Sequence, residues 1–226
     1  MYVIGLTGGI ASGKSTISNH LRTLGAYIID ADEIGHMLLE KDTEELAAIK
    51  KVFGSAIFLP NGSLDRKALG NLVFSDSKAL MKLNRIVHPG IKRVVEETLD
   101  KLGQEGNVKV AVIDAALLIE AGWYDMVDEV WLVTIDEAEQ VRRLMDRNKL
   151  TYEASKNRIK SQMPQDRKLK YAHRIIDNTG SREDTFRMIN LIWMDLIEKM
   201  EEQSGDSEKF GNKVEDYSAA DVSHHH

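Results

Sequence analysis

Five short apolar runs, rich in β-branched residues, alternate with longer segments that have helical spacing. They cover residues 2–7, 26–30, 108–114, 129–135 and 174–177. Because polar residues hardly interrupt these runs, they are typical of strands in a parallel sheet that is covered on both faces. A helical pattern over 14–24, closed by Gly25, follows the first run directly. The alternation predicts a three-layer α/β fold with a five-stranded parallel sheet.

Two of the connections between these strands are far longer than a simple turn requires. Residues 31–107 separate the second strand from the third, and residues 136–173 separate the fourth from the fifth. Structureless loops of that length are uncommon inside a compact domain, so each connection must carry helices. We therefore expect a helical insertion at 31–107 and a second helical segment, called the lid below, at 136–173. Within the insertion, helical patterns cover 43–53, 65–74, 77–86 and 89–102.

Residues 1–202 are expected to form one domain, and residues 203–226 a polar tail. The last helical pattern of the domain covers 181–202. The tail has no sustained apolar periodicity and ends in three histidines, which look like the remnant of a purification tag. It is therefore left out of the predicted fold and function.

The most specific motif is a glycine-rich loop between the first strand and the first helix. It fits the pattern of a glycine, four residues and then Gly-Lys-Ser, and its backbone N–H groups can converge on a phosphate. Lys14 would reach the β and γ oxygens, and Ser15 would ligate Mg²⁺. A chance glycine-rich turn would not need this strand–loop–helix setting. The motif predicts a P-loop NTPase fold whose nucleotide-binding residues are Gly8, Gly9, Ala11, Ser12, Gly13, Lys14, Ser15 and Thr16.

Kinases, motors, ATPases and regulatory GTPases all carry such a loop, so the loop does not fix the function. Residues 32–35 match the Asp-x-x-Gly string of GTPases, and residues 148–151 nearly match Asn-Lys-x-Asp. The first string follows Lys14 too closely to leave room for a switch segment. The second places Thr151 where the carboxylate that pairs with guanine should stand. A guanine-nucleotide switch is therefore not favoured.

Two carboxylates, Asp30 and Asp32, stand at the end of the second predicted strand. The carboxyl ends of parallel strands are where α/β sheets place their ligands. A carboxylate there can orient an acceptor hydroxyl and take its proton during phosphoryl transfer. Asp32 could instead cap the helix that follows it, and one residue can do both. The position favours a kinase and leaves the role of Asp32 open.

A strongly basic segment runs from Arg142 to Arg174 within a chain of net charge −6. Phosphoryl transfer needs cations that compensate the charge on the transferred group. Arg142, Arg143, Arg147 and Arg158 are therefore candidates for a lid that closes over the γ-phosphate. A merely solvated basic helix face is the alternative. Nucleic-acid binding is poorly supported, because few aromatic residues are interleaved with the charges.

The composition matches an ordinary globular protein, with 226 residues, 42% hydrophobic and 29% charged. The absence of cysteine excludes disulfides, thiol nucleophiles and thiolate metal sites. No apolar run approaches the ~20 residues that span a bilayer, and the N-terminus does not look like a signal peptide. We expect a cytoplasmic protein without membrane or nucleic-acid partners.

Several strings together are much more specific than the phosphate loop alone. From Tyr2 to about Met200 the chain resembles the dephospho-CoA kinases, P-loop enzymes that phosphorylate the ribose 3′-hydroxyl of dephospho-coenzyme A in the last step of coenzyme A synthesis. The resemblance is carried by Gly-Leu-Thr-Gly-Gly-Ile at 5–10, Asp-Ala-Asp at 30–32, Val-His-Pro at 87–89, Leu-Leu-Ile-Glu at 117–120, Arg142-Arg143 with Arg147, and Ile-Asp-Asn-Thr-Gly at 176–180.

The resemblance implies a reaction and a set of residues. The reaction would use ATP with Mg²⁺ and 3′-dephospho-CoA, which the helical insertion would hold. His88 would shape the substrate site or merely start a helix, because proline follows it. The implied catalytic residues are Asp32 as the base, with Lys14, Arg142, Arg143 and Arg147 around the transferred phosphoryl group. The implied substrate-binding residues are Asp32, His88, Leu117, Leu118 and Glu120, and Asn178 and Gly180 would border the adenine of ATP.

The chain departs from the family pattern at two positions. Ala116 stands where the family usually has proline, and Asn148 where it often has aspartate. The first departure puts the rigidity of the substrate-side loop in doubt, but neither touches the phosphate loop or Asp32. A nucleoside or nucleotide kinase of the same architecture is the runner-up function, and a nucleotide-switched regulatory or nucleic-acid-binding protein is the alternative from another class. A monomer is expected, with a homo-oligomer left open.

Overall fold

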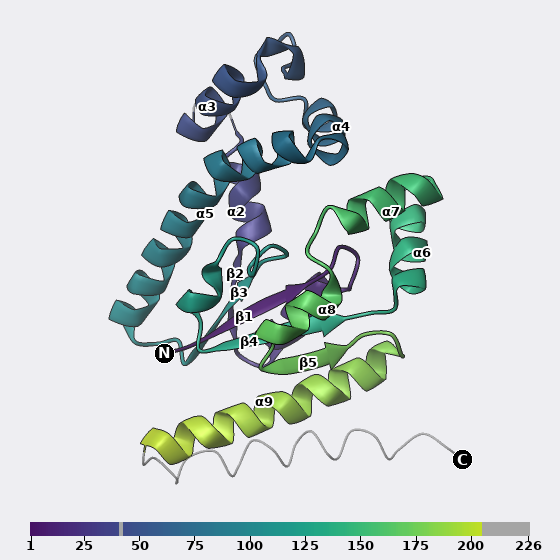
Figure 1. The fold of residues 1–226 in the computed structure, drawn as a ribbon. Coiled ribbons are helices and arrows are strands. Elements are labelled where there is room, and N and C mark those ends of the chain that lie inside the picture. The colour runs from purple at the N-terminus through teal and green to yellow at the C-terminus, as the bar shows by residue number, and fades with distance from the viewer. Residues whose placement is uncertain (41–42, 205–226) are drawn as a thin grey trace, which may run out of the picture. The chain divides into compact units, whose positions relative to one another are not determined.

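A single parallel sheet of five strands organises the fold, as the sequence predicted (Figure 1). The computed structural model describes residues 1–40 and 43–204. The strand order is β2-β3-β1-β4-β5, so β1, which leads into the phosphate loop, lies in the centre. The strands are β1 (Tyr2–Gly8), β2 (Tyr27–Asp30), β3 (Val110–Asp114), β4 (Glu129–Thr134) and β5 (Arg174–Asp177).

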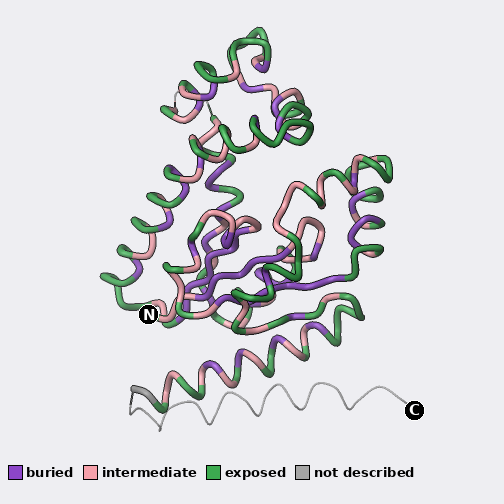
Figure 2. Tube along the Cα trace, viewed as in Figure 1, coloured by how far each residue is buried: buried purple, intermediate pink, exposed green. Residues whose placement is uncertain are grey.

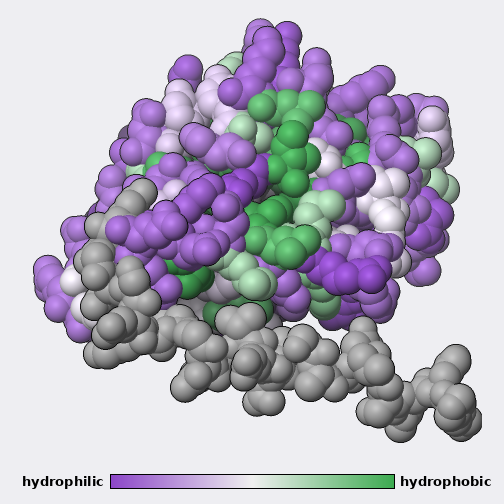
Figure 3. Space-filling view, turned by 90° about the horizontal axis from the view of Figure 1, so that it is seen from below, coloured by the Kyte–Doolittle hydropathy of each residue, from purple (hydrophilic) through white to green (hydrophobic). Residues whose placement is uncertain are grey.

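The three central strands are buried along almost their whole length (Figure 2). Every residue of β3 is buried, and Ile4 and Leu6 of β1 are fully buried. This burial explains why the strands appear in the sequence as unbroken apolar runs. By contrast, most of the surface drawn in Figure 3 is hydrophilic, with the most prominent group of hydrophobic residues near the middle of the view and smaller groups elsewhere.

The helices follow the predicted order. Helix α1 (Lys14–Thr23) connects β1 to β2, and the lid contains α6 (Glu137–Asn148), α7 (Tyr152–Lys160) and α8 (Gln165–Lys168). Short 3₁₀ turns cover Ser55–Ile57, Trp123–Met126 and Leu169–Tyr171, and α9 (Arg182–Ser204) follows β5. Within the described part of the chain, no helix is long and apolar enough to span a membrane.

The long connection between β2 and β3 is helical, with α2 (Ala31–Met37), α3 (Glu44–Phe53), α4 (Arg66–Ser75) and α5 (Ser77–Glu105). Thr43, Asp65 and Asp76 cap the last three of these helices by accepting hydrogen bonds from first-turn N–H groups. The predicted break between residues 86 and 89 is wrong, because α5 continues through Pro89. Proline removes one backbone hydrogen bond, but apolar residues buried on both sides of it hold the helix together: Ala79, Val87, Ile91, Val95 and Leu102.

By contact density the chain divides into two compact units, Met1–Phe186 and Arg187–His226. The sheet, the insertion, the lid and every predicted site residue belong to the first unit. Apart from its first two residues, the tail predicted at 203–226 lies outside the described residues. The single domain predicted over 1–202 stays a prediction.

Candidate active site

The phosphate loop has the conformation that its motif predicts. The loop turns back on itself through a hydrogen bond of 3.0 Å from Ser12 N to Gly9 O, and Gly13 has a φ of 92°. Such a left-handed φ favours glycine, because a Cβ would crowd the backbone. No side chain caps the N-terminus of α1 at this point. The N-terminus of α1 therefore offers a phosphate site.

Side chains from distant parts of the chain hold the loop in this shape. Gln140 of α6 donates to Ile10 O at 2.6 Å, and the side-chain oxygen of Gln162 accepts from Ile10 N at 2.7 Å. Asn178, just after β5, donates to Ser12 O at 2.7 Å. Neither glutamine belongs to a recognisable motif, and both were missed by the sequence analysis. Their role depends on contacts between residues more than 100 positions apart, which local patterns do not encode.

Lys14 lies between two carboxylates at the carboxyl ends of neighbouring strands. Its Nζ is 3.1 Å from Asp32 Oδ2, and it also forms an ion pair with Asp114, the last residue of β3. Burial alone would lower the pKa of Lys14, but the two carboxylates outweigh it and raise the pKa above its ordinary value. Lys14 is therefore a fixed positive charge at neutral pH.

Asp114 was missed by the sequence analysis, although a signal for it was present. It ends the strand next to β1, and its backbone is in register with Leu6 and with Asp30. Its side chain is almost completely buried. A carboxylate at the carboxyl end of a central strand is where P-loop NTPases place a residue that helps to hold Mg²⁺.

Asp32 does not cap a helix. The N-cap of α2 is Asp30, whose carboxylate accepts a hydrogen bond of 2.9 Å from Glu33 N. The capping role that the sequence left open for Asp32 is therefore wrong, because the helix begins one residue before it. About half of the Asp32 side chain is exposed, and its carboxylate accepts a hydrogen bond from Lys14. Its carboxylate is available to a ligand that enters the site.

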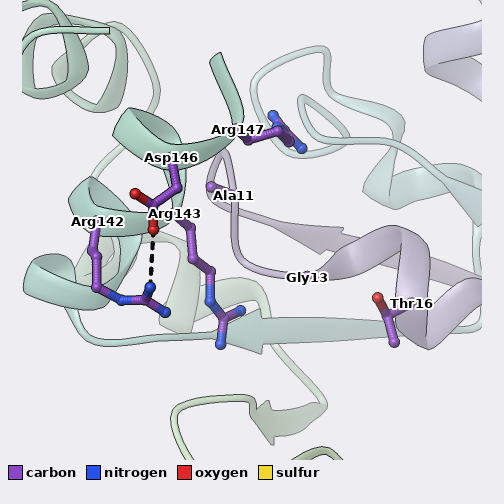
Figure 4. A pocket seen from close by; sticks show the side chains of 7 residues that line it. All are labelled: Ala11, Gly13, Thr16, Arg142, Arg143, Asp146 and Arg147. Carbon is purple, nitrogen blue, oxygen red and sulfur yellow. Dashed lines mark hydrogen bonds and ion pairs between the residues drawn. The ribbon is translucent and has the colours of Figure 1, made fainter. Parts of the chain in front are cut away.

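Three of the lid arginines, Arg142, Arg143 and Arg147, border a cavity of about 510 Å³ beside the phosphate loop (Figure 4). They project from α6 on one side, and the phosphate loop and α1 form the other side. Arg143 comes closest to the loop: its Nη1 would lie 3.4 Å from a Cβ built on Gly13. Seven residues line the cavity: Ala11, Gly13, Thr16, Arg142, Arg143, Asp146 and Arg147.

The two neighbouring arginines of α6 form ion pairs with acidic residues of the same helix, but their further contacts differ. Glu139 accepts hydrogen bonds from both Arg142 and Arg143, which hold its pKa down at about 2. Arg142 also contacts Asp146 and is mostly exposed, whereas Arg143 reaches Asn178 O at 3.2 Å. Both arginines therefore share Glu139, but Arg143 also reaches the residues beside the phosphate loop, whereas Arg142 pairs with a second acid of its own helix.

Arg158 lies away from this cavity. Its guanidinium stacks over the ring of Phe74, 4.9 Å from the centroid, and so joins α7 of the lid to α4 of the insertion. Asn178 is held by a backbone hydrogen bond to Thr134 O and by the hydroxyl of Thr185, while Gly180 is exposed. Asn178 thus holds the phosphate loop by its hydrogen bond to Ser12 O, next to Gly13.

The predicted substrate-side residues, apart from Asp32, come from two segments of the chain: the loop after β3 and helix α5. Leu117 and Glu120 are half-buried in the loop after β3, whereas Leu118 is fully buried and packs close to Gly5. His88 lies inside α5 and meets the ring of Trp123 edge-on, so the alternative that it starts a helix is wrong. Burial lowers the pKa of His88, with Glu120 opposing the shift, which favours the neutral imidazole at pH 7. The substrate roles of these residues stay predictions.

A phosphate loop at the centre of a parallel sheet, a lysine shared by two strand-end carboxylates and an arginine-rich lid define a P-loop phosphotransferase. The family model described as "Dephospho-CoA kinase" matches residues 2–184. The chain belongs to the dephospho-CoA kinase family.

Individual relatives and solved structures agree with this assignment. The chain is 47% identical to the dephospho-CoA kinase of Geobacter sulfurreducens, a match that covers 85% of this chain and 98% of the relative. It is 42% identical to that of Shouchella clausii, over 82% and 94% of the two chains. The structure of dephospho-CoA kinase from Campylobacter jejuni superposes with a TM-score of 0.62 at 30% identity, over 86% and 96% of the two chains.

A more distant structure is similar in fold alone. Shikimate kinase from Acinetobacter baumannii superposes with a TM-score of 0.50 at 14% identity, over 86% of this chain and 94% of that chain. The comparison agrees with the three-layer P-loop fold predicted from the sequence.

Proposed function

We propose that this protein transfers the γ-phosphoryl group of ATP to the 3′-hydroxyl of dephospho-CoA, with Asp32 as the general base. The observation that carries the assignment of residues is the position of Lys14 between Asp32 and Asp114 at the phosphate loop. Family membership supports the choice of substrates.

The two carboxylates hold Lys14, so the phosphates of ATP must compete for the same ammonium group. When Lys14 turns to the β and γ oxygens, Asp32 is released and can accept the proton of the acceptor hydroxyl. The hydroxyl oxygen then attacks the γ-phosphorus, and the bond from this phosphorus to the oxygen of ADP breaks. Lys14 and Arg143 stabilise the charge that develops on the transferred group and on ADP.

The residues present fit a Mg²⁺ ion that binds together with ATP. Within the described residues there is no cluster of three or more histidine or acidic side chains that could hold a metal alone. The hydroxyl of Ser15 and the carboxylate of Asp114 are oxygen donors, which Mg²⁺ prefers, and substrate phosphates usually complete its coordination. When bound, the ion would neutralise phosphate charge.

The other roles are proposed from the resemblance to the family. The insertion at 31–107 would hold dephospho-CoA on the side of Asp32, and the lid at 136–173 would close over ATP. Asn178 and Gly180 would border its adenine. A cytoplasmic location and a monomeric state remain the expectations for this protein.

The reaction is tested by coupling ADP release to a spectroscopic assay with a panel of acceptors. Turnover with dephospho-CoA supports the proposal, whereas turnover with AMP, shikimate or a nucleoside but not dephospho-CoA would replace it.

The role of Asp32 is tested in the same assay with Asp32→Asn. We expect kcat to fall by roughly 10²–10⁴-fold, as loss of a general base does, while the affinity for ATP changes little. Glu33→Gln is the matched control, because Glu33 is an exposed acid on the same turn of α2. Equal rates for Asp32→Asn and the control would remove Asp32 from the chemistry.

A further inference from the structure

Lys168, at the end of α8, is a charged residue that is almost completely buried. Only 1% of its surface is exposed, and it belongs to the basic segment that the sequence assigned to the lid. Burying an ammonium group is costly unless it is paired and hydrogen-bonded. The structure therefore gives Lys168 a different task from the exposed cations around it.

The partners of Lys168 lie at the two ends of one loop. We call residues 115–120, which follow β3, the acceptor loop. Lys168 Nζ donates to Ala116 O at 2.9 Å and forms an ion pair of 3.0 Å with Glu120 Oε1. The hydroxyl of Thr7, in β1, donates to the same Ala116 oxygen at 3.3 Å. One buried cation thus ties the start of the acceptor loop to its end.

The same segment of the chain also holds the phosphate loop. Met163 N donates to Glu120 Oε1 at 3.0 Å, and the preceding residue, Gln162, accepts from Ile10 N. Residues 162–168 therefore contact the phosphate loop at one point and the acceptor loop at several. The segment thus links the two loops, in addition to the pairing of β1 with β3.

Removing the charge of Lys168 would leave Glu120 in an unfavourable state. Glu120 Oε2 is already buried and has no hydrogen-bond partner among the described residues. Without Lys168, the carboxylate would keep the bond from Met163 N but would lose the cation that compensates its charge. Ala116, unlike proline, does not restrict its own φ, so its carbonyl depends on Lys168 and Thr7 for its position.

We infer that Lys168 is a positioning residue for phosphoryl transfer: it fixes the acceptor loop against the phosphate loop by holding Ala116 and Glu120, and it contacts neither substrate. The inference rests on the proposed function, because it assigns the acceptor loop to the side of dephospho-CoA. A displacement of reacting groups by about 1 Å can lower the rate by roughly a hundredfold, so a positioning residue can matter as much as a contacting one.

The test compares Lys168→Met with the wild type and with Lys170→Met, an exposed lysine two residues away. We expect Lys168→Met to raise KM for dephospho-CoA and to lower kcat by roughly ten- to a hundredfold, with ATP affinity changed less than about threefold. Lys170→Met should behave as the wild type. Unchanged kinetic constants in folded Lys168→Met, or an equal loss of ATP affinity, would overturn the inference.

A second variant distinguishes a loss of positioning from a loss of stability. In the double variant with Lys168→Met and Glu120→Gln, no unpaired buried charge remains, so it should be more stable than Lys168→Met alone. The stability should recover while kcat stays below that of Glu120→Gln alone, because the acceptor loop still lacks its cation. Full recovery of kcat together with stability would reduce Lys168 to a stabilising residue and overturn the positioning role.

Amide hydrogen exchange separates this inference from the proposed function. Exchange in residues 115–123 should be faster in Lys168→Met than in the wild type and in Lys170→Met, whichever acceptor the enzyme uses. If the wild type does not phosphorylate dephospho-CoA, the proposed function fails, but the exchange result still decides whether Lys168 orders this loop. Unchanged amide exchange in residues 115–123 would by itself refute the role of Lys168.

Discussion

Gly13 offers a sharp test of the phosphate-loop geometry, because two independent costs meet at this residue. Its φ of 92° is unfavourable for any residue with a Cβ, and a Cβ built there would lie only 2.1 Å from Asn178 Nδ2. Gly13→Ala must therefore strain the backbone and also displace Asn178, which would lose its hydrogen bond to Ser12 O.

The size of each cost can be worked out separately. A left-handed conformation costs an alanine about 1–2 kcal/mol, and a lost hydrogen bond costs about 0.5–1.5 kcal/mol. Gly25 provides a matched control, because its φ is 103° and nothing lies within 4 Å of its would-be Cβ. We expect the free energy of unfolding to fall by about 1–2 kcal/mol for Gly25→Ala and by about 1.5–3.5 kcal/mol for Gly13→Ala.

Urea denaturation measures the stability of both variants, and titration with ATP measures nucleotide binding. Gly13→Ala should lose most of its ATP affinity, since the clash moves the loop that holds the phosphates, whereas Gly25→Ala should bind as the wild type does. Adding Asn178→Gly to Gly13→Ala should recover part of the extra loss, because the obstructing side chain is gone. Equal stability and equal ATP affinity of the two alanine variants would refute the reasoning.

Two further predictions concern the lid and the insertion. Arg143→Met should lower kcat by roughly a hundredfold or more, and Arg142→Met should lower it far less. The reason is that Arg143, unlike Arg142, reaches the phosphate loop. Similar kcat values for the two variants in steady-state assays would contradict this. His88→Gln should flatten the dependence of Tm on pH between about 5 and 7. The folded-state pKa of His88 lies below its unfolded value, so the unfolded chain binds more protons and stability falls on acidification through this window. An unchanged Tm profile would contradict this.

The phosphate loop and the sheet were predictable because both depend on local spacing. Apolar runs mark buried strands, and the motif from Gly8 to Ser15 carries its own strand–loop–helix setting. The course of α5 was not predictable in the same way. Proline at position 89 locally favours a helix boundary, and only the buried residues on both sides of it show why the helix continues.

The candidate site was predictable only in part, and Asp32 and Asp114 illustrate the difference. Asp32 was found because two aspartates follow a strand next to the phosphate loop, but the choice of Asp30 as the helix cap needed the structure. Asp114 is 100 residues from Lys14 in the chain, and their pairing follows from the order of the strands. Strand order is a property of tertiary packing, and a local sequence pattern does not encode it.

By itself, the sequence determined the class of fold, the phosphate-binding motif and the family, because each depends on residue types at short, fixed spacings. Only the tertiary structure decided where the basic residues of the lid lie and what they contact. It turned Arg143 toward the phosphate loop, paired Arg142 with acids of its own helix and buried Lys168 against Glu120. Charge in a sequence does not distinguish these cases, because burial and distance to a partner decide whether a cation binds substrate, stays in solvent or holds a loop in place.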